Sequence, residues 1–165
     1  MRKTNKYDYV EMTEENAPSY FLEICKRYGD FCRKLLESAY VICDAEPKLT
    51  GLTGKSSDSL PSSIRNVDRY YNATLWNKVE KADREMNYYY QLRYWIHSVI
   101  SRVPSAKYAA LILNCYINGD STIVEFARVF HTDANDMRKG LIKYLKMTIT
   151  EEDIVEFNER FLNAQ

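Results

Sequence analysis

Polar side chains suited to nucleic-acid recognition repeat at helical spacing near the end of the chain. In the segment 134–147, ANDMRKGLIKYLKM, Met137, Leu141 and Leu145 recur every four residues and fall on one side of an α-helix. The opposite side then carries Asn135, Arg138, Lys139, Lys143 and Lys146. An asparagine amide can pair with adenine and an arginine guanidinium with guanine, while lysines bind phosphates. We therefore predict that this helix contacts DNA, with Thr132 of the preceding turn as a further contact.

Three short helices with tight connections are predicted around this segment. The first spans 106–117, and Gly119 ends it, because glycine readily takes the left-handed conformation that follows a helix. A capping box of Thr122 and Glu125 starts the second helix, whose inward residues are expected to be Ile123, Phe126, Ala127 and Phe130. The turn 131–133 separates the second helix from the third, whose start is favoured by Asp133 and Asp136. Helices and connections this short are typical of a helix-turn-helix.

The charge distribution agrees with DNA binding in part. Residues 100–148 contain seven basic and four acidic side chains, a balance of +3, whereas 149–165 contain five acidic side chains and one basic one, a balance of −4. Asp133 and Asp136, however, stand at the start of the third helix, where a DNA-binding protein usually avoids acids. His131 also replaces the glycine that often occupies such a turn. The alternative to a DNA-binding unit is a trihelical packing module.

Two long helices are predicted to precede this unit and to form an antiparallel hairpin over 17–103. The connecting loop is expected at 46–63, where proline, glycine and serine are frequent, and Pro104 ends the second helix. Each helix carries an apolar stripe with spacings of four and three, as in a coiled coil. The first stripe is Phe21, Cys25, Tyr28, Cys32, Leu35, Ala39 and Ile42, and the second is Leu75, Val79, Ala82, Met86, Tyr89, Ile96, Ile100 and Val103. Arg93 interrupts the second stripe, either pairing with an acidic residue of the first helix or setting the register of a homodimer formed through the long helix.

The two ends of the chain receive simpler predictions. Residues 1–16 are expected to form a loose arm. Residues 149–165 are expected to form an acidic helix that opens at Thr150, with acids at its positive end. Its apolar side would carry Ile154, Val155, Phe157, Phe161 and Leu162.

Composition excludes several classes of protein. The 165 residues have a formal net charge of +0, and no pair of the four cysteines has the spacing of a zinc site. No apolar run is long enough for a membrane span, and the polar N-terminus lacks the apolar core of a signal peptide, so we expect a cytoplasmic protein with no membrane partner. There are no paired carboxylates across a plausible cleft, no nucleophile beside a base and no metal-binding set. The chain is therefore not expected to be an enzyme or to bind a cofactor.

The three-helix stretch resembles region 4 of sigma-70-type factors. The resemblance covers 109–145 and rests on Tyr116-Ile117-Asn118-Gly119 and on the pattern Phe126-Ala127-x-x-Phe130, with phenylalanines where the family usually has aliphatic residues. A helical first half ahead of such a unit is similar to phage transcriptional regulators of the ArpU type. The resemblance implies control of late-gene transcription in a bacterial host, with host RNA polymerase as a candidate partner.

The sequence thus predicts an all-α protein: a long antiparallel helical hairpin, a helix-turn-helix over 104–148 and a C-terminal helix. The leading hypothesis is a phage or prophage transcriptional regulator that binds double-stranded DNA. Two alternatives remain open. One is an oligomeric phage assembly protein such as a small terminase subunit, and the other is a helical protein-interaction module without DNA binding.

Overall fold

The computed structural model describes residues 10–53 and 62–163, with side chains described for 10–45 and 73–163. This part of the chain is helical and contains no strand, which confirms the all-α prediction. The α-helices are α1 (Ala17–Lys26), α2 (Tyr28–Thr53), α3 (Ser62–Ser101), α4 (Ala106–Leu111), α5 (Ile123–Val129), α6 (Ala134–Thr148) and α7 (Glu151–Phe157). Two π-helical segments, η2 (Ile112–Ile117) and η3 (Asn158–Leu162), continue α4 and α7. None of the described helices is both long enough and apolar enough to cross a membrane.

The chain divides into two compact units whose boundaries differ from those expected for the hairpin. Unit 1 comprises residues 1–30 and 92–165, and unit 2 comprises residues 31–91. The helices α2 and α3 therefore each contribute to both units. Unit 2 is a continuous stretch of chain inserted into a discontinuous unit 1.

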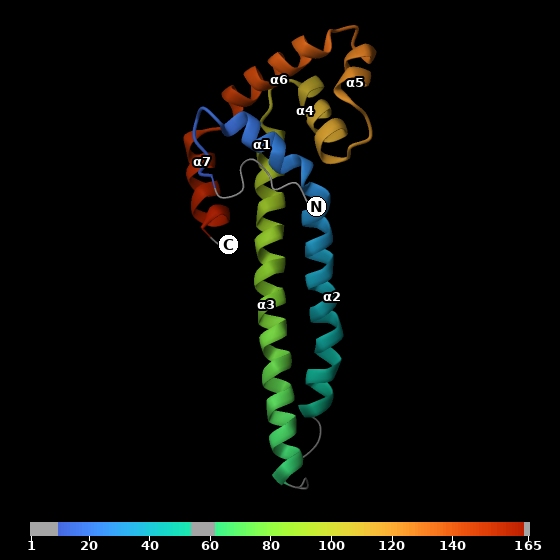
Figure 1. Cartoon of the computed structure of the whole chain (residues 1–165), viewed down its shortest axis with the longest axis vertical. Coiled ribbons are helices and arrows are strands. Elements are labelled where there is room, and N and C mark those ends of the chain that lie inside the picture. The colour runs from blue at the N-terminus through green and yellow to red at the C-terminus, as the bar shows by residue number, and fades with distance from the viewer. Residues whose placement is uncertain (1–9, 54–61, 164–165) are drawn as a thin grey trace. The chain divides into compact units, whose positions relative to one another are not determined.

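In unit 2, α2 and α3 lie side by side and run in opposite directions (Figure 1). The rings of Phe31 and Tyr89 stack with centroids 5.9 Å apart. About two turns further along α2, Ser38 Oγ donates to Glu85 Oε2 over 3.3 Å. Because the residue number rises on α2 as it falls on α3, these contacts define an antiparallel pair.

The first helix ends earlier than its apolar stripe predicts. A single helix was expected from Pro18 to about Asp44, but α1 stops at Lys26 and α2 begins at Tyr28 after a break at Arg27. The reason lies in the burial of α1. Seven of its ten residues are buried: Ala17, Pro18, Tyr20, Phe21, Leu22, Ile24 and Cys25. The remaining residues, Ser19, Glu23 and Lys26, share one side of the helix, so α1 buries most of its surface in the core of unit 1 and leaves one polar side in water.

The loop predicted at 46–63 is wrong at both of its ends. The helix α2 continues through Pro47 and Gly51 to Thr53, and α3 already begins at Ser62. The remainder of that prediction, 54–61, lies outside the described residues. Intrinsic helix propensity is a weak constraint that neighbouring helical turns can override.

Unit 1 has a core built from aromatic rings of distant segments. The ring of Trp95 on α3 lies 5.7 Å from that of Phe21 on α1 and 5.1 Å from that of Phe157 on α7. Phe21 is 0% exposed and Trp95 is 2% exposed. This cluster joins the beginning, middle and end of the sequence, so none of these helices can be removed without opening the core.

The N-terminal segment is held in place from residue 10 onward. Met12 is 1% exposed, and its amide donates to Asn158 Oδ1 while Asn158 Nδ2 donates to the carbonyl oxygen of Met12, each over 2.9 Å. The expectation of a loose arm is therefore wrong for residues 10–16, and residues 1–9 lie outside the described part. The sequence did not show this contact because its two partners are 146 positions apart.

The C-terminal helix begins as predicted. Thr150 caps α7 in a capping box with Asp153, whose carboxylate also forms an ion pair of 2.6 Å with Arg102. Ile154, Phe157 and Phe161 are buried, but Val155 is 47% exposed. The inward prediction is wrong for Val155 because it lies on the side of α7 that faces away from the aromatic cluster.

Candidate nucleic-acid interface

The second and third helices of the predicted helix-turn-helix are α5 and α6, and both begin with the predicted caps. Thr122 Oγ1 accepts from the Glu125 amide, and Glu125 Oε2 accepts from the Thr122 amide. That backbone hydrogen bond lowers the pKa of Glu125 below its usual value. At the start of α6, the Asp133 carboxylate accepts from the amides of Asn135 and Asp136. Both helix starts are therefore fixed by local side-chain contacts.

The turn between α5 and α6 has the geometry of a Schellman motif. The Thr132 amide donates to the Ala127 carbonyl over 3.0 Å, and the His131 amide donates to the Arg128 carbonyl over 3.1 Å. His131 takes the left-handed conformation, with φ of 49°. Histidine thus fills the position that glycine usually occupies at the end of a helix, at a cost of about 1–2 kcal/mol.

The inward side of α6 is as the sequence predicted. Met137, Leu141 and Leu145 are 0%, 1% and 0% exposed. They pack in unit 1, where α6 contacts α1, α4 and α5. On α5, Phe126 and Ala127 are buried, but Phe130, also expected to face inward, is 42% exposed. The helix has already ended at Val129, so Phe130 no longer follows the helical stripe.

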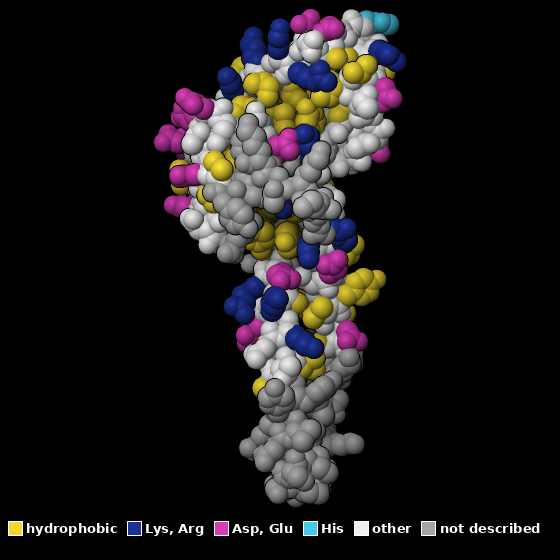
Figure 2. All heavy atoms as spheres, in the orientation of Figure 1, with side chains coloured by type: hydrophobic (Ala, Val, Ile, Leu, Met, Phe, Trp, Pro, Cys, Tyr) yellow, Lys and Arg dark blue, Asp and Glu magenta, His cyan; other side chains and the backbone are white. Residues whose placement is uncertain are grey.

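The outward side of α6 brings together four of the six predicted DNA contacts. Asn135, Lys139, Lys143 and Lys146 are exposed and spaced by four, four and three residues. At roughly 100° per residue, they fall within an arc of about 80° of the helix surface. Lysine and arginine side chains line the edge of unit 1 formed by α6 (Figure 2). We call Asn135, Lys139, Lys143 and Lys146 the α6 stripe.

Arg138 and Thr132 lie outside the α6 stripe. Arg138 lines a hollow of about 410 Å³ on the flank of α6, together with Lys26 of α1 and Tyr116 of η2. The hollow is completed by Cys115, Ser121, Thr122 and Ile123. Thr132 is half-buried, and its hydroxyl donates to the Phe130 carbonyl within the turn. The sequence placed all six residues in one interface, but the structure separates the stripe, the flanking hollow and the turn.

Two cations and a phenol meet at the hollow. Lys26 Nζ lies 5.8 Å from the centroid of the Tyr116 ring and also forms an ion pair with Glu23. Burial raises the pKa of Tyr116, while the nearby Arg138 charge acts in the opposite direction. Arg138 also donates to Asn135 Oδ1 over 3.1 Å, which links the hollow to the α6 stripe. The sequence gave no sign of Lys26, because its position beside α6 depends on tertiary packing.

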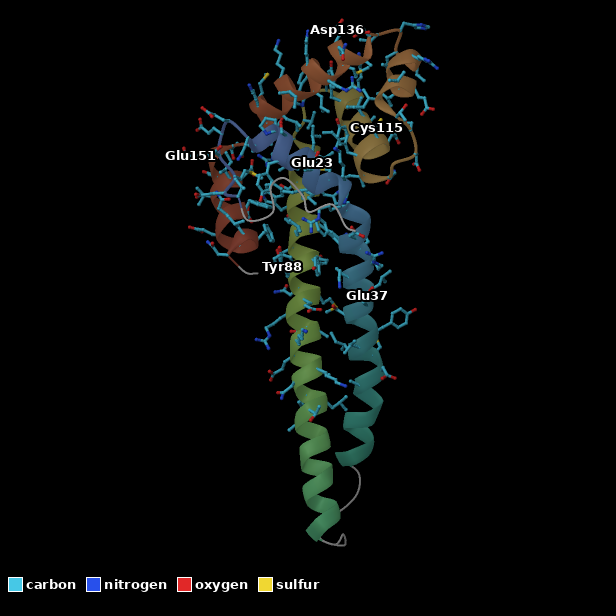
Figure 3. The ribbon with its side chains drawn as sticks, viewed as in Figure 1. Glu23, Glu37, Tyr88, Cys115, Asp136 and Glu151 are labelled. Atoms are coloured by element: carbon cyan, nitrogen blue, oxygen red, sulfur yellow. The ribbon has the colours of Figure 1, made fainter. Side chains whose placement is uncertain are left out.

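Acidic groups stand at both ends of the α6 stripe. Asp136 is exposed in the first turn of α6 and is labelled in Figure 3. At the other end, Lys146 borders a hollow of about 470 Å³ that is also lined by Glu14, Glu15 and Glu151. Lys139 and Lys143 thus lie between these two groups of acidic residues.

A close approach at Gly140 explains a residue that is unfavourable in a helix. A Cβ built at Gly140 would overlap the hydroxyl of Tyr108 and lie 2.6 Å from its Cζ. The Tyr108 ring also packs 4.8 Å from the ring of Tyr144. Glycine at this position thus makes room for the Tyr108 side chain of α4 against α6.

The described residues include cysteines and other side chains of the kinds that bind metal ions. They contain no group of three or more side chains able to hold a metal ion. The cysteines among them are free, and burial raises the pKa of the Cys25 thiol. Comparison with protein-family models, curated proteins and solved structures gives no match to this chain.

Proposed function

We propose that this chain binds double-stranded DNA through the α6 stripe and regulates transcription. The observation that carries the proposal is the state of its lysines. Lys139 and Lys143 are exposed, and no ion pair among the described residues engages them, whereas Lys26, Lys34 and Lys81 pair with glutamates. Unpaired lysines on a helix that two caps and a turn hold in place are suited to contact phosphates.

Each residue of the interface takes a role that follows from its place. Asn135 stands near the start of α6, where recognition helices contact base edges, and its amide suits adenine. Lys139 and Lys143 bind phosphates along the groove. The sequence suggested that Arg138 contacts guanine. Because Arg138 lies on the flank of α6 beside Lys26, we assign it to the phosphate backbone instead.

The salt dependence of DNA affinity tests this assignment. Each phosphate contact contributes about 0.9 to the slope of log K against log salt concentration. Replacing Lys139 and Lys143 with alanine should therefore lower the slope by about 2. The matched control is Lys78→Ala with Lys81→Ala on α3, which should leave it unchanged. Fluorescence anisotropy with random duplex DNA gives the slope for both variants.

Two results would count against the proposal. The first is no binding of the unaltered protein to any duplex at low salt. The second is an equal loss of slope in both double variants, which would show that the lysines of α6 have no special part. Arg138→Ala should reduce the slope by about 1 without changing the preferred base sequence.

A role in phage or prophage transcription rests on the resemblance to sigma region 4 and to ArpU-type regulators, with host RNA polymerase as the partner and the bacterial cytoplasm as the location. The second candidate is a helical module that binds protein instead of DNA. The exposed carboxylate of Asp136 beside the α6 stripe favours that candidate. A phage assembly protein such as a small terminase subunit is the third, and a ring of many subunits in solution would support it.

A further inference from the structure

The helix α2 carries two apolar stripes, although α3 covers only one. The stripe toward α3 is Phe31, Leu35, Ser38 and Ile42, whose members are buried or half-buried. The residues that directly follow them form the second stripe: Cys32, Leu36, Ala39 and Cys43. Its spacings are again four, three and four, those of a helix that packs on another helix. A helix in a two-helix hairpin needs one such stripe, while a helix in a four-helix bundle needs two.

The corresponding positions of α3 lie on the same side of unit 2. Trp76 and Tyr90 each follow a residue that faces α2, and they are 54% and 59% exposed. In both helices the second stripe is turned by roughly 100° from the first. Because the helices run in opposite directions, equal rotations bring the two second stripes to one broad face. Glu80, Asp83 and Asn87 occupy the middle positions on α3, so the apolar part of this face centres on α2.

The other broad face of unit 2 is suited to water. It carries ion pairs within each helix, including Lys34 with Glu37 on α2 and Lys81 with Glu85 on α3. Glu37 and Tyr88 are labelled on the two helices in Figure 3. The contrast between the faces shows which of them needs a covering partner.

The area of the apolar face is of the size that a dimer requires. Tyr40, beside the second stripe of α2, is 75% exposed, and Leu36 is 58% exposed. A fully exposed aromatic side chain presents about 150–250 Å². With Trp76 and Tyr90, these residues leave on the order of 500 Å² of apolar surface in water. A standard interface buries about 800 Å² per partner, of which somewhat more than half is apolar.

We propose that this face binds the same face of a second copy, with the two α2 helices antiparallel at the centre of a four-helix bundle. Antiparallel packing of the second stripe sets Leu36 opposite the partner's Ala39 and Cys32 opposite the partner's Cys43. It also brings Arg33 beside the partner's Tyr40, and a guanidinium and an aromatic ring attract each other. The small side chain of Ala39 allows the helix axes to approach closely at the two-fold axis.

A second copy is favoured over an unrelated partner by this self-complementarity. The second stripe of α2 supplies both Leu36 and the small Ala39 that faces Leu36 of the other copy. An isologous interface requires such a surface, because the same residues contact each other in both copies. Asp83 and Asn87 at the edge fix the register, because polar residues in a helical seam select one arrangement. The dimer does not depend on DNA binding, and a protein that binds no DNA would still form it.

Sedimentation equilibrium of the full chain tests the proposal. The unaltered protein should be a dimer, and Leu36→Glu with Tyr40→Glu should make it a monomer of unchanged helicity by circular dichroism. The matched control is the double variant Val129→Glu with Val155→Glu, which changes two exposed apolar residues of unit 1. This variant should remain a dimer. A monomeric unaltered protein, or dissociation caused by the control instead, would overturn the proposal.

Two further measurements test the dimer even if the double glutamate variant of α2 does not fold. Tyr40→Ala removes a side chain that is 75% exposed, so it leaves the core of the monomer intact and should weaken the dimer at least about tenfold. A short bis-maleimide should link Cys32 of one copy to Cys43 of the other, and Cys43→Ser should abolish the link. Within one helix these residues stand about 16 Å apart, beyond the reach of a shorter linker. A Cys43–Cys43 link instead would overturn the antiparallel arrangement.

Discussion

The two units of this protein differ in how completely they bury their apolar side chains. In unit 1, helices from both ends of the sequence surround side chains such as Phe21, Ile96 and Leu141 that are at most 1% exposed. In unit 2, the buried residues among the described side chains are Phe31, Ser38, Ala45 and Ala82, two of them alanines and one a serine. Unit 1 thus has a core of its own, whereas unit 2 has a thin seam and an apolar face left in water. The proposed DNA-binding surface on α6 belongs to the unit with the closed core.

The largest expected effect contrasts one leucine from each unit. Leu141→Ala in unit 1 should lower the free energy of unfolding by about 3 kcal/mol, because it leaves a cavity in a closed core. Leu35→Ala in unit 2 should cost about 1 kcal/mol, since the half-buried side chain loses less apolar contact. Urea unfolding followed by circular dichroism measures both. Equal losses would show that unit 2 is as well packed as unit 1.

The next effect concerns the ion pair in unit 1 between Asp153 of α7 and Arg102, the residue that follows α3. Burial alone would raise the pKa of Asp153, but hydrogen bonds from Arg102 and Thr150 outweigh it, and the net pKa lies below the ordinary value of 3.8. A carboxyl whose pKa is lower in the folded than in the unfolded protein stabilises the fold at any pH above its pKa in the unfolded protein. That contribution is lost as the pH falls through the pKa of the folded protein.

Asp153→Asn should therefore cost about 2 kcal/mol at neutral pH, and less as the pH drops below 4. Stability curves of the two proteins, measured from neutral pH downward, should converge in acid. Glu151→Gln, at the exposed start of the same helix, is the matched control and should change stability little. A constant difference between Asp153→Asn and the unaltered protein at every pH would exclude the ionised carboxylate as the cause.

The smallest effect tests the close approach that supports the α6 stripe. Gly140→Ala should destabilise the protein by about 1–2 kcal/mol, because its methyl group displaces Tyr108. In a Tyr108→Ala background the same change should instead stabilise by about 1 kcal/mol, the usual gain of alanine over glycine in a helix. A double-mutant cycle by thermal unfolding gives both values. The same sign in both backgrounds would mean that Tyr108 is not the reason for the glycine.

The sequence predicted the features that depend on neighbouring residues. These features are the capping box of Thr122, the cap at Asp133 and the inward residues of α6. Each involves contacts between residues only a few positions apart, so a short stretch of sequence is enough to predict it. The break at Arg27 and the contact of Met12 with Asn158 depend on segments that meet only in the folded chain. The sequence did not show for a similar reason that Arg138 lies beside Lys26 and Tyr116, since a helical wheel separates inside from outside but does not show which neighbour lies on each flank.

The contact between Met12 and Asn158 has a consequence for synthesis. Unit 2 is continuous in sequence, so its two helices are available for pairing once residue 91 has left the ribosome. Unit 1 must wait longer, because Asn158 is translated 146 positions after its partner Met12. The segment around Met12 therefore lacks this contact until residue 158 has left the ribosome, and unit 2 forms while the segments of unit 1 are still apart. The core that supports α6 is thus completed later in synthesis than the pair of α2 and α3 in unit 2.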